Sequence, residues 1–587
     1  MLRFPLSTAF CTGLVLFSGL IAHAEGPLDL IPASASAVVR IKSPQATIAK
    51  VANFVNAVQP GMGFAVQMQA PALGIGISNP TMGGVDLRND WYVAVFAVKN
   101  AEPAVVFLIP ASKGTDNRSG IDQMKEAVGE EFTFVAKDNW VAYSMDEAVI
   151  ELVEDCIDGA GDAIQLDRRS GELFAAGDAS IYVNIAGIAE SYSEELDAAE
   201  EQLDVILEGF MAQIPQTPGI NLAPIMEMYG QMGHGALRTA RDSNAFTLGL
   251  MLSDDSITIE ELLLVKDGSD TDKYLQTHKT SDLSILNSLP RNKLGYFALH
   301  ADFGSLAEWG MDFAAQMLTT DDNAEILEKL KKVTEDLKTV KFGSAAWAFD
   351  LADKETGILR GYAVTEATPA SKMREITRAM GEGYQFNVPG VKQEFTVETD
   401  AEKYGDLSAD VIRIKQEFDE SADPLGIQKA LQEALYGKNG TVKRVVIKGD
   451  NQVVQTFGGG PETMKEMLAT LDAPATTGDT ALTQSRGRLM EKANLIALID
   501  LPNLALKIAK VAFKNEDVKA AVPFKGEFLE GAEVPTSFIG FSAGTEAQGI
   551  RLRTEIPATT FKNFVQIAAY VQQQQLKERQ KNNNDDF

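Results

Sequence analysis

One pattern recurs four times along this chain of 587 residues, a short apolar strand that leads into a helical segment. The four strands are Ala37–Ile41, Ile181–Ile185, Tyr296–His300 and Leu495–Ile499. Each is followed by leucines or isoleucines at helical spacing and later by two more strands that a polar turn connects. Such a unit buries little apolar surface alone, so the repetition predicts sheets covered by helices and built from several copies of one unit.

A later pair of strands completes each of the four units. The pairs are Trp91–Val98 with Ala104–Ile109, Phe246–Leu252 with Ile257–Val265, Ala345–Leu351 with Ile358–Val364, and Phe538–Phe541 with Ile550–Ile556. Polar residues and glycines occupy the connections, as chain reversals require. A helix is expected after every pair, and Pro369 and Pro557 suit the first turn of the third and fourth of these helices.

The first and third units carry one additional strand pair, and this divides the chain into two tandem halves, 25–285 and 286–571. The additional pairs are Phe132–Val135 with Trp140–Tyr143 and Val445–Lys448 with Val453–Thr456. Each half then consists of one long unit and one short unit. Duplication of an ancestral half explains this order, and chance convergence of generic amphipathic patterns is the alternative.

The two halves differ in length, which locates an insertion. Matching Val38 with Phe297 and Val141 with Val453 gives two offsets that differ by 53 residues. The second half therefore contains extra residues between the matched positions. We expect the insertion near 390–442, a segment with two strand-like stretches and one helix-like stretch.

These patterns predict an α+β protein, internally duplicated, with twisted and mainly antiparallel sheets and helices packed on one face. Consecutive apolar residues over Val105–Ile109 indicate that both sheet faces are partly covered. Small polar residues near 473–488 predict a flexible linker. The Gln/Asn-rich, charged residues 572–587 predict a disordered polar tail.

The first 24 residues have the features of a secretory signal peptide. Arg3 precedes an apolar run that begins at Phe10, and the run ends in Ala22-His23-Ala24 with small residues at the two positions that a signal peptidase reads. A membrane anchor is the alternative, but a span needs about 20 apolar residues and this run is shorter. We expect cleavage after Ala24 and export to the periplasm, the cell envelope or the extracellular space.

Composition restricts the partners of the exported chain. The formal net charge of −29 opposes binding to phosphate backbones, so nucleic acid is not expected as a partner, and it also opposes docking onto anionic lipid. No later stretch is apolar enough to predict a transmembrane span in the mature chain. Without the signal peptide Cys156 is the only cysteine, so no intramolecular disulfide can form. We expect Cys156 to be a buried thiol on an amphipathic helix, with acidic neighbours that raise its pKa.

One motif suggests a catalytic serine. Gly540-Phe541-Ser542-Ala543-Gly544 matches the G-x-S-x-G sequence of serine hydrolases, which requires a strand-to-helix turn and a histidine base. A strand follows Ser542 here, and the last histidine of the chain is His300, which precedes it. We therefore expect the glycines to serve a turn between strands.

Three other segments resemble ligand sites only in part. The glycines within Phe457–Glu462 precede a helix but lack the lysine of a phosphate-binding loop. Met226, Met228, Met232 and His234 offer copper ligands, although methionine is also a common core filler. Asp267–Asp272 lacks the spacing of a calcium loop and suits a helix start. The sequence thus predicts no catalytic residue, no metal site and no cofactor.

The segment that follows the signal peptide, Leu28 to Ile41, resembles the start of certain exported bacterial proteins of unknown function. In them a Leu-Pro-Ala phrase precedes an apolar strand and recurs along the chain, as Ser288-Leu289-Pro290 does here before Tyr296. The resemblance implies export and repetition, and it implies no site residue.

The expected function is that of an exported, non-enzymatic periplasmic or cell-envelope protein with a binding or structural role, with a protein or cell-envelope component as a possible partner. One alternative is a carrier that holds an apolar or lipid-like ligand between a sheet and its helices. The other is a serine hydrolase that uses Ser542.

Overall fold

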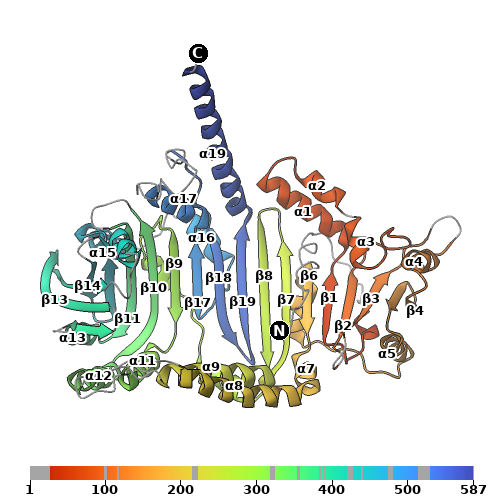
Figure 1. Ribbon diagram of the computed structural model, residues 1–587, viewed down its shortest axis with the longest axis horizontal. Helices are drawn as coiled ribbons and strands as arrows, with labels where there is room; N and C mark the ends of the chain where they lie inside the picture. The colour runs from red at the N-terminus through yellow and green to blue at the C-terminus, as the bar shows by residue number, and fades with distance from the viewer. Residues whose placement is uncertain are drawn as a thin grey trace. The chain divides into compact units, whose positions relative to one another are not determined.

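Figure 1 shows the computed structural model of the chain, whose contacts divide it into two compact units. Unit 1 comprises residues up to 203, 233–277 and 546–565, and unit 2 comprises 204–232, 278–545 and the residues from 566 onward. The described residues are 27–585 except 70, 98, 100–101, 115–117, 214–222, 318–323, 353–356, 382–384, 389–390, 419–426, 438–439, 473–479, 513–528 and 530. The expected signal peptide, 1–24, lies outside the described residues.

Unit 1 is built on one antiparallel sheet, in the order β4-β5-β3-β2-β1-β6-β7-β8-β19. Its strands are β1 (Ala37–Ile41), β2 (Trp91–Phe96), β3 (Ala104–Pro110), β4 (Thr133–Lys137), β5 (Trp140–Ser144), β6 (Ala179–Val183), β7 (Ser243–Leu252), β8 (Ser256–Val265) and β19 (Gly549–Pro557). Its helices are η1 (Pro27–Leu30), α1 (Pro44–Val58), α2 (Gly63–Met68), α3 (Ala72–Gly76), α4 (Gly120–Val128), α5 (Glu147–Asp158), α6 (Arg168–Ala176), α7 (Ile185–Ser191) and α10 (Asp270–Thr277). The helices α8 (Ser193–Gln213), α9 (Ala223–Asp242) and α19 (Ala558–Asp585) have residues in both units.

Helices cover both faces of the unit 1 sheet at β2, β3 and β5. Successive residues of a strand point to opposite faces, so Leu108 packs in the cluster that includes α5, whereas Ile109 packs in the cluster that includes α4. Ala142 and Val141 of β5 divide in the same way. The consecutive apolar residues of β3 therefore mark a strand that is buried on both faces. The expectation that helices cover only one face of the sheets is wrong at these strands.

Unit 2 also has an antiparallel sheet, in the order β18-β17-β9-β10-β11-β16-β15-β14-β13-β12. Its strands are β9 (Gly295–His300), β10 (Lys341–Leu351), β11 (Leu359–Thr368), β12 (Gln385–Val388), β13 (Val391–Tyr404), β14 (Leu407–Phe418), β15 (Thr441–Lys448), β16 (Gln452–Phe457), β17 (Leu495–Ile499) and β18 (Ile539–Glu546). Its helices are η2 (Ser284–Ser288), α11 (Phe303–Met317), α12 (Ala324–Leu337), α13 (Ala370–Gly381), α14 (Ile427–Tyr436), α15 (Pro461–Asp472), α16 (Thr480–Gly487) and α17 (Leu501–Ala512).

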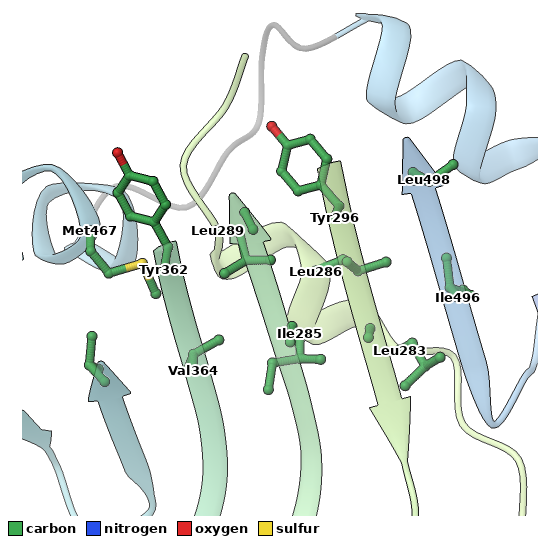
Figure 2. Close-up of a cluster of buried hydrophobic side chains, with 14 of the residues drawn as sticks. Leu283, Ile285, Leu286, Leu289, Tyr296, Tyr362, Val364, Met467, Ile496 and Leu498 are labelled. Atoms are coloured by element: carbon green, nitrogen blue, oxygen red, sulfur yellow. The ribbon is translucent and has the colours of Figure 1, made fainter. Parts of the chain in front are cut away.

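The main core of unit 2 lies between its sheet and the short helix η2 (Figure 2). Leu283, Ile285 and Leu286 turn towards the strands that carry Tyr296 and Tyr362. Residues of α15 complete this cluster on the same face. Helices α12 and α13 pack on the other face against β14, β15 and β16, so the sheet of unit 2 is covered on both sides as well.

The strands predicted from the sequence are present, and the two halves pair their strands in the same pattern. β1 lies between β2 and β6, and β9 lies between β10 and β17. The additional hairpins, β4–β5 and β15–β16, join β3 and β11 respectively. The extra strands β12, β13 and β14 continue the second sheet beyond β15 and overlap the expected insertion. Common descent of the halves stays a prediction.

One residue match between the halves is wrong by one position. Val38 is fully buried, as are Tyr296 and Ala298, whereas Phe297 between them lies on the other face of β9. A shift of one residue moves a side chain to the opposite face. Val38 therefore corresponds to Tyr296 or Ala298.

Two segments expected to lack structure are helical. Residues 572–585 continue α19, and Thr480–Gly487 form α16. Glutamine, lysine, arginine and glutamate are good helix formers, and no glycine or proline interrupts 572–585, so a helix that begins at Ala558 propagates through them. The rest of the expected linker, 473–479, lies outside the described residues. Among the helices described, none has the length and apolar character needed to cross a membrane.

Tyr143 of β5 is fully buried and lies among three other aromatic rings. Its ring lies 5.2 Å from that of Phe107, 5.8 Å from that of Phe132 and 5.6 Å from that of Phe134, between ring centroids. Its hydroxyl donates a hydrogen bond of 2.6 Å to the carbonyl of Ile77, just after α3. This contact attaches the α2–α3 segment to the sheet.

We predict that Tyr143→Phe destabilises the protein by about 1–3 kcal/mol, because the buried carbonyl of Ile77 loses its donor. Tyr143→Ala should cost about 3–5 kcal/mol, since it also empties the aromatic cluster. Tyr229→Phe, at a tyrosine that is 54% exposed, serves as the control and should change little. Calorimetric unfolding measures all three variants, and equal effects of the two Tyr143 variants would contradict the assigned hydrogen bond.

Candidate functional site

A pocket of about 610 Å³ opens in unit 2 beside η2 and α16. Its lining residues are Asp282, Leu286, Asn287, Leu482, Thr483, Arg486, Gly487, Leu489 and Glu491. The volume falls within the range that small-molecule sites occupy, roughly 300–1,000 Å³. The pocket therefore has room for a ligand.

Leucines form the apolar part of the pocket, and the sheet holds them in place. Leu286 and Leu489 belong to the buried cluster over β9 and β17, and Leu482 packs against that cluster. Leu482, Arg486 and Leu489 recur at helical spacing, so one face of α16 and the residues after it turn towards the sheet. This spacing in the sequence indicates helix α16, but the many small polar residues nearby favour the prediction of a linker.

Arg486 connects the two sides of the pocket. Its Nη1 donates to the carbonyl of Met490 (2.8 Å), and its Nη2 donates to the carbonyls of Asp282 (2.9 Å) and Glu491 (2.7 Å). Burial lowers the pKa of the guanidinium, and the carboxylates of Asp282 and Glu491 oppose this shift. An arginine remains cationic in proteins, so Arg486 acts as a charged clamp between η2 and the residues after α16.

Carboxylates give the pocket its remaining charge. The backbone N–H and the hydroxyl of Ser284 hold the pKa of Asp282 below its usual range, with support from the charges of Arg486 and Lys492. Asp282 and Glu491 thus place two negative charges on a lining with one cation, which is itself bonded to carbonyl groups. The site combines an apolar leucine wall with a weakly anionic polar side.

A second pocket, of about 350 Å³, lies between β14 and α14. Its lining is polar and comprises Lys415, Gln416, Glu417, Lys429, Gln432, Glu433, Gly437 and Gly440. Lys415 and Glu417 form an ion pair of 2.8 Å, and both side chains are exposed. It therefore lacks the buried apolar wall that distinguishes the first pocket.

The structure places Ser542 inside strand β18, with no strand-to-helix turn. Gly540 and Gly544 also lie within this strand, so the expectation that they serve a turn between strands is wrong. Ser542 is fully buried and pairs with Ile496 of β17. Its Oγ accepts a hydrogen bond of 3.3 Å from the N–H of Met490. This environment gives the hydroxyl no access to a substrate, so the G-x-S-x-G match carries no hydrolase geometry.

The glycines before α15 form a tight turn. Gly458, Gly459 and Gly460 all have positive φ, a conformation that favours glycine. A Cβ atom on Gly459 would lie 2.1 Å from the Oγ1 of Thr463, so the helix approaches the turn too closely for any side chain. The turn needs all three glycines for its backbone conformation, and Gly458 and Gly459 also for close packing.

The remaining candidate ligand residues are distributed along helices. Met226, Met228, Met232 and His234 lie on α9, where His234 Nδ1 is 3.4 Å from a carboxylate oxygen of Glu200. Within the described part of the chain, no group of three or more His, Cys, Asp or Glu side chains could hold a metal ion.

The acidic segment Asp267–Asp272 caps α10, as expected. Ser269 Oγ accepts a hydrogen bond of 3.1 Å from the N–H of Asp272, and Asp272 Oδ2 accepts one of 3.0 Å from the N–H of Gly268. The helix begins at Asp270. The hydroxyl of Ser269 thus caps the helix, and the carboxylate of Asp272 bonds back to the N–H of Gly268.

The prediction for Cys156 is confirmed. It lies on α5, and its side chain is buried. Burial raises the pKa of the thiol, and the charges of Asp155 and Asp162 raise it further. A neutral buried thiol is a poor nucleophile, so this position is structural.

A cluster of charged side chains in unit 2 surrounds Asp410 of β14, whose side chain has no exposed surface. Arg374 of α13 bonds both oxygens at 2.6 and 2.9 Å, and Arg378, one turn later, bonds both at 2.7 and 2.8 Å. The N–H of Asp400 adds a fifth bond of 2.9 Å. Every acceptor position is used by the protein, so the cluster fastens α13 to the sheet.

We predict that Asp410→Asn destabilises unit 2 by about 3–5 kcal/mol at pH 7, because two arginines lose their buried counter-charge. Burial opposes ionisation of Asp410, but the hydrogen bonds from Arg378 and Arg374 outweigh it and hold its pKa far below the usual value. A depressed folded pKa stabilises the protein above the unfolded pKa of about 3.9, and this stability is lost as the pH falls towards the folded pKa. The deficit of the variant should thus shrink below pH 4.

Calorimetric melting at pH 7 and pH 3 measures this deficit. Asp406→Asn, in the exposed turn between β13 and β14, is the matched control and should melt like the wild type at both values. A deficit that is as large at pH 3 as at pH 7 would refute the assigned ionisation.

Comparisons with protein-family models, with curated proteins and with solved structures give no match. The resemblance of the segment from Leu28 to exported bacterial proteins stays a prediction. No function can be transferred from a relative, and any function of this chain has to be argued from the geometry of its own residues.

Proposed function

We propose that this chain is an exported, non-enzymatic binding protein that holds a small amphipathic molecule in the pocket of unit 2. The observation that carries the proposal is the combination of a leucine wall and a charged clamp in a pocket of about 610 Å³. This combines the binding role with the carrier alternative that the sequence left open.

The lining favours one class of ligand over others. An apolar portion would lie against Leu286, Leu482 and Leu489 and replace water there. The polar end would meet Asp282 and Glu491, because two carboxylates face one cation and three of the five N–H donors of Arg486 already bond carbonyls. A neutral or cationic head group is favoured over an anionic one.

A non-enzymatic role agrees with the surroundings of the side chains that sequence motifs suggested. Ser542 is buried within a strand, and Cys156 is held neutral by burial. The acceptor oxygens of Asp410 are bonded by Arg374, Arg378 and the N–H of Asp400. The pocket offers binding contacts instead.

We predict that Thr483→Trp, on the pocket lining, abolishes binding because the indole occupies the space beside Leu482. Gln484→Trp, at the adjacent exposed position outside the lining, is the matched control and should bind normally. Native mass spectrometry of the purified protein reports a retained ligand, and titration calorimetry with octylamine and with octanoate reports the head-group preference. We expect octylamine to bind at least about tenfold more tightly.

Two outcomes would contradict the proposal. One is a ligand-free mass for the wild type together with no heat from either probe. The other is equal loss of binding in the two tryptophan variants, because only one of them fills the pocket.

Export makes a separate prediction. A mature chain that begins at Glu25 is expected when the full sequence is expressed in a bacterium with a secretory pathway, since cleavage follows Ala24. Intact mass measurement of the periplasmic or secreted fraction tests this. A chain that retains residues 1–24 in a soluble cytoplasmic fraction would contradict export.

A further inference from the structure

A second candidate site lies in unit 1, in a segment that contains no charged residue. Charged residues make up 23% of the chain, so 35 residues of average composition would contain about eight. The 35 residues from Val51 to Val85 contain none, and no histidine either. This segment includes the end of α1 and the short helices α2 and α3. The chain thus presents one uncharged region within a protein of net charge −29.

The inner side of α2 packs closely on α1, beside which it lies (Figure 1). The Oδ1 of Asn56 accepts hydrogen bonds from the N–H groups of Gly61 (3.2 Å) and Gly63 (2.8 Å). A Cβ atom on Gly63 would lie 2.4 Å from the carbonyl of Ala52, so the two helices are in backbone contact. Val66 packs on α1 from the same side. The orientation of α2 is therefore fixed.

Four large apolar side chains on or beside these short helices are exposed and belong to none of the core clusters. Phe64 is 67% exposed and Met68, one turn later, is 64% exposed. Ile75 of α3 is 72% exposed, whereas its neighbour Leu73 packs into the core. Met62, before α2, is 46% exposed. We call Met62, Phe64, Met68 and Ile75 the α2–α3 patch.

The size of the α2–α3 patch limits what can cover it. A large side chain has about 200 Å² of surface, so these four expose roughly 500 Å². A stable dimer needs about 800 Å² on each partner, and two copies would also bring two strongly negative chains together. An apolar patch of a few hundred Å² is instead enough for shallow insertion into the interface of a membrane.

We propose that the α2–α3 patch docks the protein onto an electrically neutral lipid surface, with Phe64, Met68 and Ile75 inserted among the lipid chains. The absence of charge over 51–85 lets this region enter the interface without desolvating an ionised group. The negative charge of the rest of the chain selects against anionic lipid, since the two surfaces repel. The binding is peripheral and independent of the ligand pocket in unit 2.

Sedimentation with phosphatidylcholine vesicles tests the proposal on the mature chain at 0.15 M NaCl. The double variant Phe64→Ser/Met68→Ser should reduce the partition coefficient at least about tenfold, and Phe64→Trp should bind and show a blue-shifted emission. Met145→Ser is the matched control, because Met145 is 69% exposed but is followed by Asp146 and Glu147. Adding phosphatidylglycerol should weaken the binding of the wild type.

Three outcomes would overturn the proposal. The first is a wild type that does not sediment with phosphatidylcholine vesicles. The second is a loss of binding in Met145→Ser that is as large as the loss in the double variant. The third is a wild-type dimer in light scattering that the double variant dissociates, which would assign the α2–α3 patch to a second copy of the chain. Unchanged thermal unfolding of the double variant confirms that it is folded, because both substituted side chains are exposed.

Discussion

Both units depend on strands that are buried on two faces. Antiparallel pairing satisfies the backbone, and the alternation of side chains sends successive residues to different helices, as Leu108 and Ile109 of β3 show. A strand of this kind tolerates no change of register, because a shift of one residue exchanges its two buried sets. The helices α4 and α5 in unit 1, and α13 and α15 in unit 2, are therefore tied to fixed positions along their strands.

Charged groups are placed differently within the sheets and at the two proposed sites. Within the sheet of unit 2, Arg374 and Arg378 bond both oxygens of Asp410. This carboxylate therefore stabilises the fold and is not available to a ligand. The two sites that we propose lie outside such clusters of charged side chains. In the pocket of unit 2, Leu286 and Leu489 are themselves buried in the core, and the half-buried Leu482 lies on the lining with Arg486. On α2 and α3, apolar side chains face outward where the segment carries no charge.

Most strands could be predicted because each carries its own signal. Apolar residues of β1, β6, β9 and β17 stand between polar turns, and the hairpins reveal themselves by Asn, Asp and Gly at the reversals. Sequence patterns did not reveal helix α16, because small polar residues surround its one leucine, Leu482. They did not reveal the end of α19, because its polar residues are typical both of a helix and of a disordered tail. In these two segments composition was a weaker guide than continuity with a neighbouring element.

The sequence by itself determined the α+β class, the order of strands and hairpins, the structural roles of Cys156 and Asp267–Asp272, and the lack of context for catalysis by Ser542. These features are local, since they depend on spacing and on near neighbours along the chain. Only the tertiary structure decided that Asp282 and Arg486, which are 204 residues apart, meet at one pocket. It alone also showed which apolar residues of α2 and α3 face α1 and which face outward. Both outcomes depend on packing between elements distant in sequence or on opposite sides of one helix, and no periodicity of a short segment encodes them.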